Sequence, residues 1–183
     1  DAQQQRRVFH ITGSGVDLIG LTIMNGAAAN YGGGLLIDGG GSATLEYCEI
    51  SSNSAGRSFG GNAGGLAILG AAALNYCNIF SNTASAGAGG GLLIGSGGSA
   101  TLEHCDISNN NALRGGGLLI GGDVTLNNCQ IFNNEARYGV GLYISVITSA
   151  AHAVLRCCTV EDPIHGDYEE RACPPPLPPP LPP

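Results

Sequence analysis

The sequence contains no lysine and no tryptophan, and its seven basic residues are all arginine. Charged residues make up 11% of the 183 residues, against roughly 25% in an average soluble domain. Without lysine there is neither a phosphate-binding P-loop nor a Schiff-base nucleophile. The 14 acidic residues give a net charge of −7, so we expect no nucleic-acid binding. The hydrophobic fraction of 43% can still fill a core, which argues against intrinsic disorder.

Long apolar runs and a targeting leader are also missing. No segment approaches the roughly 18 uninterrupted apolar residues of a membrane helix, so we expect no transmembrane segment. The chain starts without methionine and without a basic segment followed by an apolar one, and we expect any signal peptide to have been removed or left out. Proline is nearly absent before residue 174, whereas eight of the nine prolines lie in residues 174–183. A glycine-rich body and a proline-rich tail therefore share one chain.

A repeat organises the glycine-rich body. Each copy contains a G-G-G-L-L-I-like segment, a Gly/Ser turn, an A-T-L-E-Y-C-E-I-like segment and an S-x-N-x-A segment. Six copies can be aligned, with equivalent leucines 24 to 31 residues apart. The segments are short, aliphatic or β-branched, and bounded by Gly, Asn or Ser, which predicts two or three strands per copy and no helix. This predicts a β-solenoid of about six coils, since a propeller blade would need roughly 40–50 residues.

Equivalent positions of successive copies form columns when the coils are stacked. Leucine and isoleucine columns are the expected core, and a cysteine column between them is expected to consist of buried thiols. Its members are Cys48, Cys77, Cys105, Cys129 and Cys158. An asparagine column three residues after the isoleucine is expected to form a hydrogen-bonded ladder. Its members are Asn53, Asn82, Asn110 and Asn134. In the last copy Pro163 occupies the asparagine position, so the ladder is expected to end before it.

Two stretches carry a resemblance to known families. The I-[SF]-x-N-x-A segment followed by G-G-[GA]-[LI] resembles the repeat of polymorphic outer-membrane and adhesin-like proteins. Residues 8–26, V-F-H-I-T-G-S-G-V-D-L-I-G-L-T-I-M-N-G, are similar to the first coil of pectin-lyase-like β-helices. The resemblance covers residues 8–162 and implies an all-β, right-handed parallel β-helix. It is weak for function, because this scaffold carries enzymes, adhesins and structural fibres alike.

No catalytic constellation stands out. Polysaccharide lyases of the resembled class are expected to use Arg or Lys beside carboxylates or Ca²⁺. The candidate arginines fall instead in variable loops: Arg57, Arg114 and Arg137. Glu46 and Glu103 share a column but are two coils apart, with Asn75 between them. The distance expected between their carboxylates only reaches the upper limit of the ~6.5–9.5 Å range of an inverting glycosidase. Asp162 and His165 match no standard metal-ligand spacing. We predict no catalytic residue, no metal ligand and no cofactor.

Two of the seven cysteines lie outside the column. Cys157 belongs to the corner position of the last copy, and Cys173 immediately precedes the proline run. If the chain is exported, a Cys157–Cys173 disulfide would tie the C-terminal cap and the tail to the last coil.

The tail has a four-residue P-P-P-L period, which predicts a polyproline II helix. It resembles the hydroxyproline-rich cell-wall glycoproteins of green algae and plants. That resemblance implies hydroxylated, O-glycosylated prolines at Pro174, Pro175, Pro176, Pro178, Pro179, Pro180, Pro182 and Pro183. A stiff linker to a further segment is the alternative, and an assembly element that contacts a neighbouring subunit is the sharper hypothesis.

The predicted organisation is a parallel β-helix over residues 1–162, a C-terminal cap over 163–173 and a polyproline II tail over 174–183. We expect a non-enzymatic, secreted structural protein, a subunit of an extracellular or cell-surface fibre or other homo-oligomer, with glycans on the tail. The first alternative is an adhesin or carbohydrate-binding β-helix. The second is a polysaccharide lyase or hydrolase-like enzyme, which would need a groove with clustered carboxylates and arginine.

Overall fold

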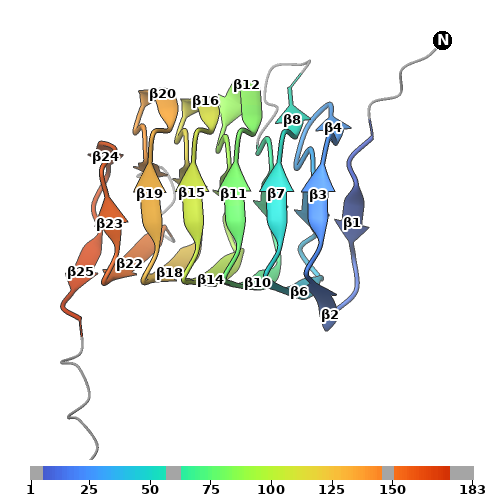
Figure 1. The fold of residues 1–183 in the computed structure, drawn as a ribbon, viewed down its shortest axis with the longest axis horizontal. Helices are drawn as coiled ribbons and strands as arrows, with labels where there is room; N and C mark the ends of the chain where they lie inside the picture. The colour runs from blue at the N-terminus through green and yellow to red at the C-terminus, as the bar shows by residue number, and fades with distance from the viewer. Residues whose placement is uncertain (1–5, 57–62, 146–150, 174–183) are drawn as a thin grey trace, which may run out of the picture.

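The computed structural model describes residues 6–56, 63–145 and 151–173. These residues form a rod of stacked coils, with the first coil at one end and the last at the other (Figure 1). Every regular element in the described part of the chain is a β-strand, and strands of successive coils pair in parallel. None of the described residues belongs to a helix able to cross a membrane. The predicted polyproline II tail lies outside the described residues.

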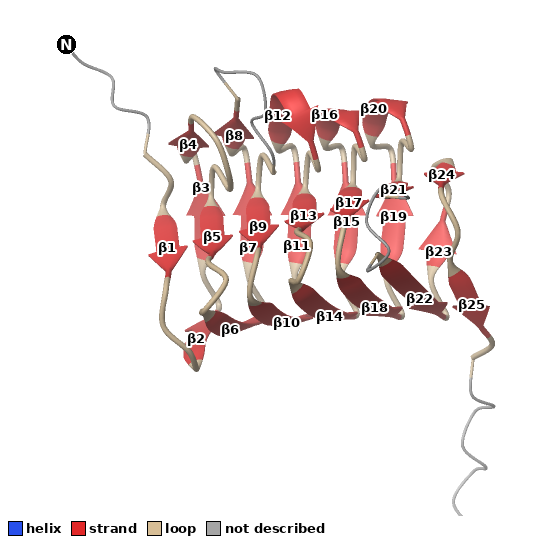
Figure 2. Ribbon diagram, turned by 180° about the vertical axis from the view of Figure 1, so that it is seen from behind, coloured by secondary structure: helices blue, strands red, loops and turns tan. Residues whose placement is uncertain are grey.

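Four parallel sheets run along the rod, and Figure 2 shows them from behind. Sheet A contains β1 (Phe9–Ile11), β5 (Leu35–Ile37), β9 (Leu66–Ile68), β13 (Leu92–Ile94), β17 (Leu118–Ile120), β21 (Leu142–Ile144) and β24 (Ile164–His165). Sheet B contains β2 (Val16–Ile19), β6 (Ser42–Glu46), β10 (Ala71–Asn75), β14 (Ser99–Glu103), β18 (Asp123–Asn127), β22 (His152–Arg156) and β25 (Glu169–Arg171).

The two smaller sheets complete the cross-section. Sheet C contains β3 (Thr22–Met24), β7 (Glu49–Ser51), β11 (Asn78–Phe80), β15 (Asp106–Ser108), β19 (Gln130–Phe132) and β23 (Thr159–Val160). Sheet D contains β4 (Ala27–Ala28), β8 (Ser54–Ala55), β12 (Thr83–Ala88), β16 (Asn111–Arg114) and β20 (Glu135–Tyr138).

The predicted all-β parallel solenoid is confirmed. Within the described residues, five coils place a strand in all four sheets, a sixth contributes β21, β22 and β23, and β24 and β25 extend sheets A and B beyond it. Sheet D supplies a fourth strand per coil that the sequence pattern did not reveal. Its first members, β4 and β8, have only two residues each, too few for a period-2 pattern to appear.

The corners between sheets rely on single residues in the left-handed region. Between sheets B and C one such residue recurs in each of six coils: Gly20, Tyr47, Tyr76, His104, Asn128 and Cys157. Their φ angles are close to one another, 64° at Gly20 and 53° at Tyr47. A second column after sheet C consists of Asn25, Ser52, Ser81, Asn109 and Asn133. Because non-glycine residues adopt this conformation at a modest cost, equivalent corners can differ in side chain while the backbone repeats.

The core is built from the predicted columns. Leu45, Leu74 and Leu102 are paired in register across sheet B, and all three are fully buried. Ile50, Ile79 and Ile107 do the same in sheet C. Each buried leucine or isoleucine contributes about 1.5–3 kcal/mol relative to exposure. The hydrophobic effect therefore sets the register, since a one-residue slip would turn every one of these side chains to solvent.

The asparagine column forms a continuous hydrogen-bonded ladder. The Asn82 side chain shows the unit: its Nδ2 donates to Ile50 O at 2.8 Å, and its Oδ1 accepts from both Asn53 N and Asn53 Nδ2 at 3.0 Å. Asn110 and Asn134 repeat these contacts. Buried amides need partners for all their donors and acceptors, and stacking identical residues supplies them.

The end of this ladder differs from the expectation that the pattern stops at Pro163. Asp162 Oδ2 accepts from Asn134 N at 2.9 Å and from Asn134 Nδ2 at 2.8 Å, the two bonds that the next asparagine would otherwise accept. The chain supplies this acceptor one residue earlier than the repeat alignment indicates. A carboxylate suits a terminal position, because it accepts hydrogen bonds without needing to donate to a further coil.

Candidate functional site

The outer face of sheet B carries an open groove of about 380 Å³. Its floor is formed by small side chains, among them Thr44, Ala73 and Thr101, with Asp123 and His152 toward one end. This lining supplies hydroxyl and methyl groups but no carboxylate pair across the groove. Strand pairing places Asp123, the one carboxylate of the lining, opposite His152.

The acidic residues beside this groove are separated as the repeat predicted. Strand pairing places Glu46 opposite Asn75, and Asn75 opposite Glu103. In sheet C, Asn78 likewise separates Glu49 from Asp106. Two coils correspond to roughly 9.6 Å. Carboxylates alternate with amides along both columns, which favours hydrogen bonding at the surface over paired acid and base chemistry.

The residues considered for metal binding have other contacts. No group of three or more His, Cys, Asp or Glu residues in the described part of the chain is placed to hold a metal ion. Asp162 ends the asparagine ladder, and the His165 ring stacks on Tyr143 with centroids 4.7 Å apart. The Arg114 guanidinium also lies 6.0 Å from the centroid of Tyr143.

Arg137, the other candidate arginine that the structure describes, lies beside an aromatic ring. The Arg137 guanidinium lies 5.5 Å from the centroid of the neighbouring Tyr138 ring. Arg57 falls outside the described residues.

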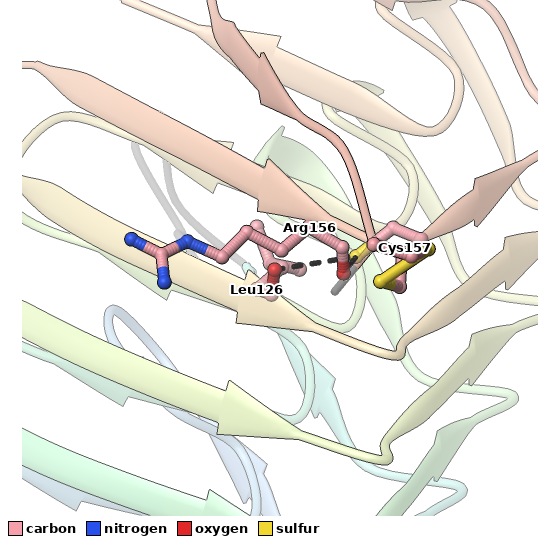
Figure 3. The surroundings of a disulfide bond; sticks show 5 residues. Leu126, Arg156 and Cys157 are labelled. Atoms are coloured by element: carbon pink, nitrogen blue, oxygen red, sulfur yellow. Dashed lines mark hydrogen bonds between the residues drawn. A yellow bond between two sulfur atoms is a disulfide. The ribbon is translucent and has the colours of Figure 1, made fainter. Parts of the chain in front are cut away.

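A disulfide links the last coil to the end of the cap. Cys157 and Cys173 are joined across a sequence separation of 16, with Cα atoms 5.0 Å apart (Figure 3). Cys157 is the corner residue after β22, and Cys173 follows β25, which pairs with β22. The bond thus closes the last turn of the chain onto the solenoid and holds the residue immediately before Pro174 at that end.

The cysteine column lies inside the rod next to this disulfide. Its members Cys48, Cys77, Cys105 and Cys129 are buried and Cys158 is half-buried, all as free thiols. The Cys158 thiol donates to Leu126 O and to Arg156 O, both at 3.3 Å (Figure 3).

Hydrogen bonds with Cys105 lower the pKa of Cys77 and of Cys129. Burial raises the pKa of Cys48, and a hydrogen bond with Cys129 together with burial raises the pKa of Cys158. Cysteines buried in an apolar core are inert in disulfide exchange because no partner reaches them, and Cys48, Cys77, Cys105 and Cys129 are buried in this way.

An exposed aromatic stack on the corner between sheets B and C is the feature that sequence reasoning missed. The Tyr47 and Tyr76 rings stack with centroids 5.2 Å apart, and Tyr76 and His104 with centroids 4.8 Å apart. Each of these residues immediately precedes a cysteine of the column, so their common position in the repeat could be read from the sequence. The missing step was to recognise that a left-handed corner residue points its side chain outward, where rings of adjacent coils meet.

The first coil exposes apolar side chains at the opposite end from the disulfide. Within the described residues, β1, β2, β3 and β4 are the terminal strands of the four sheets. Exposed apolar side chains on this coil are Val8, Phe9, Ile19, Leu21 and Met24. A terminal strand edge with apolar side chains is a template for association.

Comparison with known proteins agrees with this architecture. A family model described as a right handed beta helix region matches residues 33–165. No curated protein and no solved structure matches the chain. The family includes enzymes as well as non-enzymes, so it sets the fold and leaves the activity open. Because the match spans more than half of the sequence, the chain belongs to the right-handed β-helix family.

Proposed function

We propose that this protein is a non-enzymatic, secreted structural β-helix that serves as a subunit of an extracellular or cell-surface fibre. The proline-rich tail mediates contact with a neighbouring subunit and carries O-glycans. The observation that carries the proposal is the anchoring of Cys173, the last residue before the tail, to Cys157 on the final coil. A tail that leaves the rod from a fixed point can direct assembly, because little orientational freedom has to be lost on binding.

The opposite end of the rod supports the same function. Within the described residues, the first coil contributes the terminal strands of the four sheets and exposed apolar residues, including Phe9 and Met24. A subunit with a tethered tail at one end and an apolar edge at the other has two different contact surfaces. Such heterologous contacts generate filaments when the operation relating the subunits does not close.

The surface chemistry also favours a structural role over catalysis. Glu46 and Glu103, which share an outward column of sheet B, are separated by the amide of Asn75. The buried polar groups of the asparagine ladder are used in hydrogen bonds between coils. These features maintain a regular rod and supply no acid and base at one bond.

The test is electron microscopy of the full chain produced through a secretory pathway, combined with mass spectrometry of the tail. We expect rods joined end to end and tail masses raised by hydroxylation and sugar. The matched control is the chain ending at residue 173, which keeps the solenoid and should lose end-to-end contacts. Single unassembled rods with unmodified prolines, or sugar release from polysaccharides by the purified chain, would refute the proposal.

A further inference from the structure

The C-terminal end of the rod places a third cysteine beside the disulfide. Cys158 follows Cys157 in the chain, and both residues are half-buried, whereas Cys173 is exposed. All three line one open cavity of about 550 Å³, together with Glu170 and Arg171 of β25. A thiol and a disulfide that share a cavity are the two reactants of thiol–disulfide exchange.

The strand register of sheet B makes Cys158 a second possible partner of Cys173. Arg156 of β22 pairs with Arg171 of β25. Continuing this register by two residues brings Cys173 level with Cys158, one coil away at a strand spacing of about 4.8 Å. That spacing lies within the range of about 4.4–6.8 Å found between the Cα atoms of disulfides. Cys173 is bonded instead to Cys157, with Cα atoms 5.0 Å apart, so two cysteines lie within its reach.

Cys158 lies in a more open environment than the rest of the cysteine column. Cys129, the preceding member, is fully buried, whereas Cys158 is half-buried. Besides the cavity that it shares with the disulfide, Cys158 lines a space of about 180 Å³ at the end of the core, next to Ile164 and Tyr168. The Cys158 side chain therefore has room to turn from Leu126 O, its hydrogen-bond acceptor, toward the disulfide.

We propose that Cys157, Cys158 and Cys173 form a thiol–disulfide exchange site that presents either Cys158 or Cys157 as the free thiol. The Cys158 thiolate attacks Cys173 Sγ, so that the Cys158–Cys173 bond forms as the Cys157–Cys173 bond breaks. Cys157 leaves as a thiolate and takes up a proton from water, which replaces the proton that Cys158 released. One disulfide replaces another, so the step consumes no oxidant and no reductant.

The exchange moves the free thiol from the end of the core to an outer corner. Cys157 has φ 54° and occupies the left-handed corner position at which Tyr47 and Tyr76, both with φ 53°, expose their side chains. A Cys157 thiolate at this corner can attack one sulfur of a soluble disulfide. A mixed disulfide then forms, and the other half of the reagent leaves as a thiolate. The site therefore takes a low-molecular-weight disulfide, and oxidised glutathione is the probe.

The exchange is expected to be slow. A hydrogen bond with Cys129 together with burial raises the pKa of Cys158, so little of this thiol is present as the nucleophilic thiolate. Uncatalysed disulfide rearrangement takes minutes to hours. The reaction is therefore followed over about a day.

The test incubates the full, folded chain with an excess of oxidised glutathione and locates adducts by peptide mass spectrometry without reduction. We expect one glutathione on Cys157 and a disulfide between Cys158 and Cys173. Both disulfide arrangements keep Cys173 attached to the last coil. This inference goes beyond the structural role, and its failure would leave the fibre proposal intact.

Two variants separate the exchange from direct reaction of a thiol. Cys158→Ser keeps a donor to Leu126 O and should form at least ~10-fold less adduct, because Cys157 stays bonded to Cys173. Cys157→Ser should also form little adduct, and its Cys158 should be found bonded to Cys173.

The substitution at position 157 suits its backbone, since Ser52 and Ser81 adopt φ 55° and 54° at the neighbouring corner column. Cys48→Ala removes a buried thiol at the other end of the column and is the matched control. It should form as much adduct as wild type. Circular dichroism checks the folding of each variant.

Four results would overturn the proposal. They are no adduct on the wild-type chain, glutathione on Cys158 beside an intact Cys157–Cys173 disulfide, equal modification of folded Cys158→Ser, and a free Cys173 in folded Cys157→Ser.

Discussion

The two ends of the rod manage the same physical problem differently. Any solenoid has terminal strands whose backbone groups lack a neighbouring coil. At the C-terminal end, Asp162 closes the asparagine ladder, the charged strand β25 covers the edge of sheet B, and a disulfide holds β25 in place. The N-terminal end of the described chain has no equivalent and exposes apolar side chains such as Met24. The described residues thus close the repeat at one end with polar and covalent contacts, and at the other end they leave apolar side chains of the first coil exposed.

The disulfide is the strongest element of the C-terminal end. Cys173→Ser should destabilise this end by about 3 kcal/mol, because the closed loop no longer restricts the unfolded chain. The measurement is amide exchange together with denaturant unfolding. Exchange should accelerate in β25 and stay unchanged in β2 at the other end. Reduction of the wild-type chain should reproduce the effect, and equal exchange in both forms would contradict it.

Asp162 should be next in importance. Asp162→Ala removes the acceptor of two hydrogen bonds from Asn134 and leaves partly buried donors unpaired, which should cost about 2 kcal/mol. Asp162→Asn keeps an amide oxygen of the same reach and should lose far less. Urea unfolding midpoints of the two variants measure the difference. Equal losses would mean that the ladder does not need a specific terminal acceptor.

A substitution at the N-terminal edge should change association between subunits and leave the free energy of unfolding almost unchanged. Met24→Lys places a solvated charge on an exposed edge, which should weaken end-to-end contact while changing the unfolding free energy by less than about 0.5 kcal/mol. Tyr168→Lys, at an exposed position of the C-terminal end, is the matched control and should assemble like wild type. Sedimentation velocity distinguishes them. If both variants assemble equally well, the apolar edge is not a contact surface.

The smallest effect concerns the ion pair on β25. Arg171 donates to Glu169 and lowers the pKa of that exposed carboxyl. A lowered folded-state pKa stabilises the fold above the unfolded value and is lost as pH falls through the folded value. Glu169→Gln should therefore unfold slightly more easily than wild type at pH 7 and equally at low pH. Thermal unfolding at several pH values measures the gap, and a gap that widens in acid would contradict this sign.

The regular part of this molecule was predictable because repetition makes its physics visible. Six aligned copies locate the inward leucines and isoleucines, and Asn53, Asn82 and Asn110 recur at one offset where only a shared hydrogen-bonding role explains them. The irregular positions were harder to predict. Asp162 accepts the hydrogen bond that a ladder asparagine would accept, although it lies one residue before the aligned position. Two-residue strands of sheet D such as β4 are too short to show a period.

The sequence by itself determined the fold class, the register of the coils and the identity of the buried columns, because burial acts on every copy alike. It also identified Cys157 and Cys173 as the two cysteines outside the column. Only the tertiary structure decided that the rings of Tyr47, Tyr76 and His104 form one exposed stack. That stack depends on the direction in which corner side chains point, and the direction is set by backbone geometry rather than by hydrophobic pattern.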